Sequence, residues 1–165
     1  MDWLTTVDHK KIGILYLLAG GFFFLIGGLE AILIRIQLAY PDQQIFVGDA
    51  FNQLTTMHGT TMIFFAAMPV IFAFMNAIVP LQIGARDVAF PFVNSLGFWL
   101  FFAGGVLMNT SWFLGGAPDG GWTGYAPLSS ITDAGWGQTL EGNIRGTDFY
   151  VLGLQIAGIG TLIGG

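Results

Sequence analysis

The side chain best suited to metal chemistry is His58, which lies within the apolar stretch 52–80, NQLTTMHGTTMIFFAAMPVIFAFMNAIVP. An ionisable residue inside an apolar span is expensive to bury and indicates a functional site by default. Met62 and Phe65 follow at i+4 and i+7 and extend an apolar face, while Gly59 leaves room for a large planar group. A neutral imidazole in such surroundings suits an axial ligand of haem iron. The alternative is an imidazole that bonds a carbonyl or hydroxyl group of a neighbouring helix.

The second histidine, His9, is a poor candidate for the other axial ligand. It stands between Asp8 and Lys10 in a polar segment, and we expect it to be solvated. It would also lie across the membrane from His58. A second ligand for the iron must therefore come from outside this chain.

Arg35 and Glu30 are charged residues near the far end of the apolar run 12–38. On a helix, residues five positions apart point about 140° away from each other, so the two make poor partners. Arg35 either extends its guanidinium group to the membrane surface or binds an anionic or carbonyl group of a buried cofactor. Glu30 lies about one turn deeper, and we assign it no role from the sequence.

Asp87 immediately precedes the apolar run 88–114, and Asn94 follows it by seven residues, two turns deeper on the same helix face. Asn76, from the stretch 52–80, should approach the same membrane surface. A carboxylate at an aqueous mouth followed by buried amides is what a file of proton-conducting waters needs. The alternatives are helix capping by Asp87 and amide bonding between helices.

A single helix over 52–80 would carry both His58 and Asn76, which are eighteen residues apart. That spacing is about five turns and ~27 Å. It predicts that the two side chains share one face, at opposite edges of a hydrocarbon core about 30 Å thick. Pro69 should kink this helix because it lacks an N–H group and its ring clashes with the preceding turn.

The composition is that of a membrane protein: the 165 residues are 54% hydrophobic and 9% charged, with a mean hydropathy of +0.70. The net charge of −5 argues against a nucleic-acid partner. The absence of cysteine excludes disulfides, thiolate metal sites and covalently attached haem. We predict an all-α, multi-pass transmembrane helix bundle. It has three complete spans, at about 12–38, 52–80 and 88–114, and a fourth at 149–165. We expect this chain to be a fragment that stops near the end of the fourth span.

The basic residues predict the orientation of the bundle, because Lys and Arg in short loops favour the cytoplasmic side. Lys10 and Lys11 precede the first span and Arg86 lies between the second and third. The N-terminus is therefore expected inside, with the loops 39–51 and 115–147 outside. That places His58 near the outer surface, level with Arg35, and Asn76 near the inner one. Four aromatic side chains suit an interfacial belt: Trp112, Trp122, Tyr125 and Trp136.

From about residue 7 to its end, the chain resembles subunit I of the haem–copper terminal oxidases of the cytochrome c oxidase type. The resemblance rests on DHKKIGILYLL, LIRIQLAYP, TMHGTTMIFFAAMPVI, NAIVPLQIGARDVAFPFVNSLGFWL and GWTGYAPL, which keep the order and spacing of that family. The closest likeness is to bacterial enzymes, particularly those of Gram-positive bacteria, as an N-terminal fragment of the subunit.

The resemblance implies a role for each matching residue. His58 matches an axial ligand of the low-spin haem (haem a), whose partner histidine lies on a later helix. Arg35 matches the arginine that bonds the formyl group of that haem, and Trp122 the tryptophan under its propionates. Five residues match positions of the D-type proton channel. Asp87 matches its entrance carboxylate, Asn76 and Asn94 match its asparagines, and Tyr16 and Thr161 match polar residues farther along it.

The resemblance also implies a proton-pumping respiratory oxidase that passes electrons from cytochrome c to a haem–copper centre and reduces oxygen to water. The second haem, the copper and their ligands belong to later helices, so we expect no activity from this chain alone. Subunits II and III, an electron donor and the lipid membrane are the implied partners. The implied location is the bacterial cell membrane rather than the mitochondrial inner membrane.

Three alternatives stay open: a quinol-oxidising member of the family, a helical transporter or channel without haem, and a structural part of an assembly. Three departures from the family pattern matter. Gln37 stands where some members carry a glutamate that binds sodium or calcium, Arg86 replaces a proline common in its loop, and the acidic insertion 129–146 has no assigned role.

Overall fold

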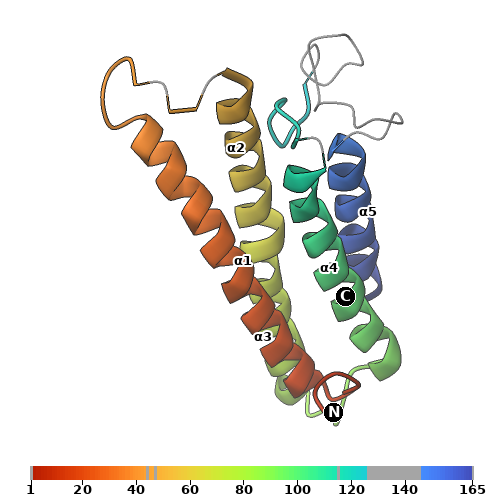
Figure 1. Cartoon of the computed structure of the whole chain (residues 1–165). Coiled ribbons are helices and arrows are strands. Elements are labelled where there is room, and N and C mark those ends of the chain that lie inside the picture. Colours follow the sequence, from red (N-terminus) through yellow and green to blue (C-terminus); the bar gives the residue numbers. More distant parts are fainter. Residues whose placement is uncertain (1, 44, 47, 115, 126–145, 165) are drawn as a thin grey trace.

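The computed structural model describes residues 2–43, 45–46, 48–114, 116–125 and 146–164. Every regular element in these ranges is a helix, which confirms the predicted all-α class (Figure 1). The elements in chain order are α1 (His9–Gln37), α2 (Gly48–Thr60), the π-helix η1 (Thr61–Ala67), α3 (Met68–Gln82), α4 (Pro91–Thr110), the 3-10 turn η2 (Ser111–Phe113) and α5 (Gly146–Gly164).

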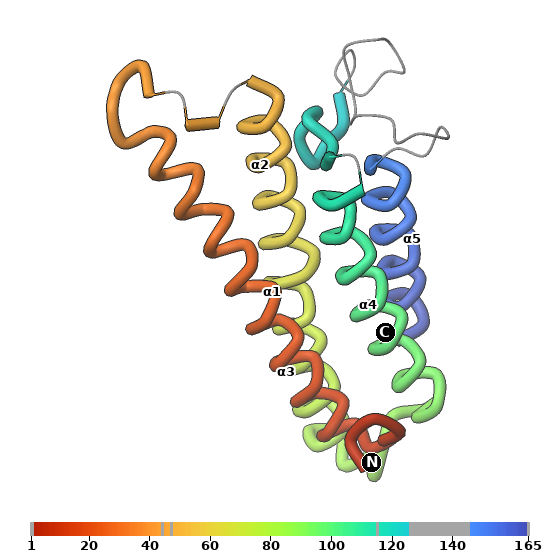
Figure 2. Tube along the Cα trace, in the orientation of Figure 1, coloured from red at the N-terminus to blue at the C-terminus, as the bar shows by residue number. Residues whose placement is uncertain are grey.

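Four helical rods are long and apolar enough to cross a membrane: His9–Gln37, Gly48–Gln82, Pro91–Phe113 and Gly146–Gly164. The second rod contains α2, η1 and α3 as one continuous helix (Figure 2). Each rod has 19 residues or more, close to the roughly 20 residues that a helix needs to span the hydrocarbon core. We call the end of the bundle that carries His9 and Gln82 the N-terminal end, and the end that carries Gln37 and Gly48 the distal end.

Local sequence accounts for where two of the helices begin. The Asp8 carboxylate accepts a hydrogen bond from the backbone N–H of Lys10 at 3.0 Å, so α1 has an acidic N-cap. Pro91 stands in the first turn of α4, where a missing N–H costs nothing. The third apolar run therefore becomes helical only at Pro91, and Asp87 lies in the non-helical link 83–90.

The π-helical segment changes the register of the second rod. Residues 61–67 follow the wider π pattern, and the backbone N–H of Met68 bonds the carbonyl of Ile63, five residues back. Each such wide turn inserts a residue relative to an α-helix. The segment ends just before Pro69, the residue from which we expected a kink. Because of this register change, His58 and Asn76 are not separated by the five whole turns that an uninterrupted α-helix would give.

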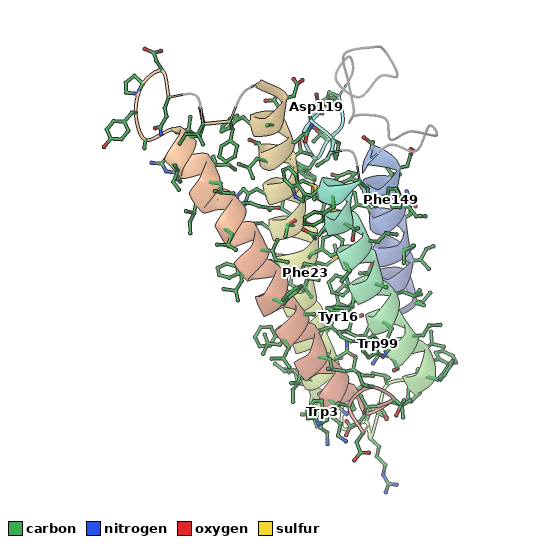
Figure 3. The ribbon with its side chains drawn as sticks, viewed as in Figure 1. Trp3, Tyr16, Phe23, Trp99, Asp119 and Phe149 are labelled. Carbon is green, nitrogen blue, oxygen red and sulfur yellow. The ribbon has the colours of Figure 1, made fainter. Side chains whose placement is uncertain are left out.

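Close packing of the helices depends on glycines that face backbone atoms. A Cβ atom on Gly104 would lie 2.5 Å from the carbonyl oxygen of Gly153, and one on Gly160 would lie 2.6 Å from that of Gly97. α4 and α5 therefore approach as closely as small-residue interfaces in membranes allow. Between α1, η1 and α4 the core is aromatic: the rings of Phe65 and Phe101 stack with centres 5.6 Å apart. Figure 3 shows Tyr16 and Phe23 pointing into this space.

Candidate cofactor and proton-transfer sites

The His58 ring is oriented by helix α1. Its Nδ1 atom lies 2.9 Å from the backbone carbonyl oxygen of Gly27. Because a carbonyl can only accept, Nδ1 must carry the proton, which leaves Nε2 with a free lone pair. The ring is half-buried rather than enclosed. The carbonyl bond that we weighed as an alternative to metal binding is thus present, and it uses the nitrogen that a metal would not need.

The surroundings of His58 are apolar and partly open. A Cβ atom on Gly59 would lie 3.7 Å from Cδ1 of Trp122, so the 116–125 segment covers the helix beside the histidine. Trp122 also packs on Phe64, with ring centres 5.9 Å apart, and stays 51% exposed. From Met62 an apolar groove of about 470 Å³ continues toward the N-terminal end, between α1 and the second rod.

Phe65 is more deeply buried than His58. It is fully enclosed and packs against Phe23 of α1 and Phe101 of α4. The His58 ring bonds Gly27, one turn from Phe23 on α1, so both side chains contact α1, and Phe65 reaches α4 as well. Met62 keeps its place on the α1 side, because a Cβ atom on Gly27 would lie 2.7 Å from its sulfur.

Arg35 and Glu30 differ in environment. Arg35 is exposed in the last turn of α1. Its backbone stands eight residues beyond Gly27, or roughly 12 Å along the axis, rather than level with the ring of His58. Glu30 is 6% exposed beside Trp112 of η2, and its Oε2 atom has no partner among the described residues.

The opposite end of the second rod carries a polar network. The Nδ2 atom of Asn94 donates to Oδ1 of Asn76 at 2.6 Å, so α4 and α3 are joined by the amide bond that was the alternative to a proton path. Both residues are buried. Asn76 also donates to the carbonyl of Phe72 in its own helix. Because Asn76 faces α4 whereas His58 faces α1, the prediction of one shared face is wrong, but the two do lie at opposite ends.

His9 is a functional candidate that we misjudged, because it is 1% exposed rather than solvated. Its Nδ1 atom lies 2.7 Å from the backbone carbonyl oxygen of Asn76, and its Nε2 atom is buried without a partner among the described residues. A signal was available in the sequence: His9 shares a helix face with Ile12 and Tyr16, at i+3 and i+7. Glu30 offered the same signal, because it follows Gly27 and Phe23 by three and seven residues on that helix.

The other predicted proton-channel residues lie around this network. The Tyr16 hydroxyl is buried without a partner in the described part of the chain, and a Cβ atom on Gly164 would lie 3.5 Å from it. Asp87 is half-buried, and its carboxylate caps the N–H of Val88 at 2.8 Å. The segment 87–90 is not helical, so the two-turn spacing to Asn94 is incorrect. Thr161 donates to the carbonyl of Gly158 in its own helix at 2.8 Å.

A cleft of about 130 Å³ lies beside the amide pair. Its walls are Phe72, Met75, Asn76, Val79, Pro80, Val88 and Gly164. This volume holds several water molecules. The cleft reaches from the polar side chain of Asn76 to Val88, which is the neighbour of Asp87 in the sequence.

A hydrogen bond from α2 holds one of the distal loops. The Thr56 hydroxyl accepts from the backbone N–H of Gly121 at 2.9 Å, which fixes the 116–125 segment on α2. Nearby, burial raises the pKa of the Asp119 carboxyl, and the charge of Asp49 raises it further. The insertion 129–146, with Trp136, lies almost entirely outside the described residues.

Gln37 does not fit a cation site. Its Oε1 atom accepts from the backbone N–H groups of Ile45 and Phe46, at 3.0 and 2.8 Å, and its Nε2 atom donates to the carbonyl of Gln43. Both polar atoms of the amide are therefore used to close the loop after α1. A sodium or calcium ion needs oxygen atoms directed at it, and this side chain directs its oxygen at N–H groups.

A haem iron, in contrast, fits His58 as one axial ligand. Among the described residues there is no cluster of three or more His, Cys, Asp or Glu side chains that could hold a metal ion. A haem needs less from the protein, because the porphyrin supplies four ligands and the protein one or two. The free Nε2, the carbonyl bond at Nδ1 and the apolar groove meet that requirement for one side of the iron.

Comparison with known proteins gives the family. The family described as Cytochrome C and Quinol oxidase polypeptide I matches residues 11–165. The chain is 66% identical to cytochrome c oxidase subunit 1 of Bacillus subtilis over 164 residues, 99% of this chain and 25% of that protein. It is 66% identical to the corresponding protein of Bacillus sp. (strain PS3) over 163 residues, again 99% and 25%.

A third relative has a different electron donor in its name. The chain is 48% identical to the probable quinol oxidase subunit 1 of Staphylococcus aureus (strain USA300) over 164 residues, 99% of this chain and 23% of that protein. The chain thus spans about a quarter of the length of these relatives. From the family match over residues 11–165, this chain belongs to the cytochrome c and quinol oxidase polypeptide I family.

Proposed function

We propose that this chain forms part of the catalytic subunit of a proton-pumping respiratory oxidase and holds one side of a low-spin haem a through Nε2 of His58. The observation that carries the proposal is the 2.9 Å bond from Nδ1 to the Gly27 carbonyl. Such a bond fixes the tautomer and the ring plane and makes the ligating nitrogen more basic. When bound, the haem supplies one-electron transfer.

The chain's other residues would then orient and shield that group. Trp122, which lies against Gly59 and stays half exposed, would bond the propionates. The Arg35 side chain leans toward the N-terminus of its helix, as helical side chains do, and so back toward the level of His58 and the formyl group. The groove beyond Met62 takes apolar groups and keeps water out. The second axial histidine comes from a part of the subunit outside this chain.

The experiment is a His58→Ala substitution in the intact oxidase, read by its visible spectrum. We expect the low-spin haem signal to disappear while the assembled subunit is still recovered. Thr55→Ala is the matched control: Thr55 is exposed on the same helix and bonds only the carbonyl of Phe51. An unchanged low-spin signal in His58→Ala would overturn the proposal.

We further propose that protons enter at Asp87, pass the cleft beside Asn76 and Asn94, and continue past Tyr16 toward Thr161. The support is the arrangement of a half-buried carboxylate, a cleft large enough for water and buried amide oxygens. Asn94 Oδ1 and Tyr16 Oη are buried without partners in the described ranges. Buried polar atoms of this kind are normally satisfied by ordered water.

The electron donor proposed is cytochrome c, on the strength of the 66% identity to the two Bacillus proteins. The 48% identity to a probable quinol oxidase keeps quinol as the second candidate. Subunits II and III and the bacterial cell membrane complete the proposed setting, with Lys10, Lys11 and Arg86 on the cytoplasmic side. Oxygen consumption by the whole complex, with reduced cytochrome c against a reduced quinol, distinguishes the donors.

A further inference from the structure

A second apolar groove lies on the other flank of α1, away from His58. It has a volume of about 280 Å³. Its α1 wall includes Leu15, Leu18 and Phe22, and its α4 wall Phe98, Trp99 and Phe102. These residues extend over two helical turns, or roughly 10 Å along α1. The one polar atom among these side chains, Nε1 of Trp99, already donates to the carbonyl of Leu4 at 3.1 Å.

The groove has a positive charge at its N-terminal end. Lys11 precedes Leu15, Leu18 and Phe22 by four, seven and eleven residues, and these intervals place all four on one face of a helix. The Lys11 ammonium lies 5.9 Å from the centre of the Trp3 ring. Figure 3 shows Trp3 and Trp99 at this same end of the bundle.

Its acidic neighbours do not neutralise this lysine directly. Asp8 uses its carboxylate to cap the N–H of Lys10. Asp2 is exposed in the N-terminal segment. The part of the chain that the structure describes shows no ion pair to Lys11, so its charge is available to a ligand whose acidic group sits at the membrane surface.

We propose that this groove binds an anionic phospholipid of the cytoplasmic leaflet, with an acyl chain between α1 and α4 and the phosphate near Lys11. The proposal goes beyond the oxidase function and depends on the proposed orientation with the N-terminus inside. An acyl chain needs no hydrogen bonds along its length, which is what these walls offer. A basic residue at the cytoplasmic end of a groove between transmembrane helices selects anionic headgroups, and indole rings favour the same interface.

The test compares lipid retention by intact oxidase variants. The complex is stripped of lipid in detergent and given phosphatidylglycerol or phosphatidylcholine, and the lipid that stays bound is counted by native mass spectrometry. Leu18→Trp should fill the groove and abolish the retained phosphatidylglycerol. Leu25→Trp is the matched control, because Leu25 is similarly exposed (68% against 63%) two turns farther along α1 and lines no part of this groove. Equal retention by the two variants would refute the site.

The charge is tested separately. Lys11→Gln should weaken phosphatidylglycerol binding about fivefold, the effect of one lysine near an anionic headgroup, and leave phosphatidylcholine binding unchanged. Lys10→Gln, about 100° around the helix, should have the smaller effect, and the reverse order would contradict the assignment. A photoreactive amino acid in place of Leu18 decides the occupant directly. Adducts with lipid support the proposal, whereas adducts only with another protein segment show that protein fills the groove.

Discussion

The two ends of the second helical rod present opposite kinds of polar site. At the distal end, His58 is held by one bond to Gly27 and turns a free nitrogen toward an apolar, partly open space. At the N-terminal end, Asn76 is buried and bonded to partners on three helices, α1, its own α3 and α4. Under the proposed function, the first would be half of a site that a haem and a helix outside this chain complete. The second forms within this chain and needs only water.

The largest effect is expected from removing the carboxylate of Asp87, the proposed proton entrance at the N-terminal end. In the intact oxidase, Asp87→Asn should slow turnover by about 100-fold, the lower range for a group that transfers a proton. The low-spin haem spectrum should not change, because Asp87 belongs to the other end. Oxygen consumption and the spectrum are measured on the same sample. Arg86→Gln, at the exposed neighbouring position, is the control and should retain most of the activity.

The amide pair offers the next largest effect. Asn94→Leu removes the donor to Asn76 Oδ1 and leaves that buried oxygen without it, which costs about 1–3 kcal/mol. We expect a lower thermal denaturation midpoint for the intact complex in detergent. Asn52→Leu is the control, because Asn52 is exposed on the distal part of the second rod, which also carries Asn76. It should change the midpoint little. Equal shifts would mean that the amide pair is not an important contact.

At the distal end, the comparison predicts a smaller and more local loss. Gln37→Ala removes the acceptor for the N–H groups of Ile45 and Phe46. The net cost should be roughly 1 kcal/mol, because water can replace bonds of this kind at a partly exposed site. Limited proteolysis should cut the 38–47 loop faster, without a change in the haem spectrum. Gln82→Ala, exposed at the other end of the bundle, should leave the cutting rate as it was.

The smallest expected effect is a pH dependence at Asp119. Burial raises its pKa in the folded protein, so the folded state binds this proton more tightly than the unfolded chain does. Its contribution to stability is full below the ordinary carboxyl pKa and is lost as the pH rises through the raised one. Asp119→Asn should therefore flatten the decline of the denaturation midpoint over that pH window. A decline that is equally steep in the variant would contradict this assignment.

The sequence was sufficient for the features that depend on one-dimensional hydrophobicity. The apolar runs predicted four spans because a bilayer requires about 20 apolar residues per helix, and the structure has helices at all four places. His58 and Asn76 were singled out because polar side chains in such runs are costly. Helix ends were less accurate: Pro91, rather than Val88, begins α4.

Tertiary structure decided the features that depend on register and on neighbours. The π-helical turns before Pro69 changed the helical register between His58 and Asn76, and the sequence pattern does not reveal such a shift in backbone hydrogen bonding. His9 proved to be buried because α3 supplies a carbonyl for its ring.

From the sequence by itself came the four membrane helices and the histidine suited to an iron, since both follow from the cost of placing polar groups in an apolar medium. Only the packed structure showed which nitrogen of His58 is free and which helix each polar group faces. Those facts depend on carbonyls and side chains many residues away: Gly27 stands 31 residues from His58, and Asn94 stands 18 from Asn76.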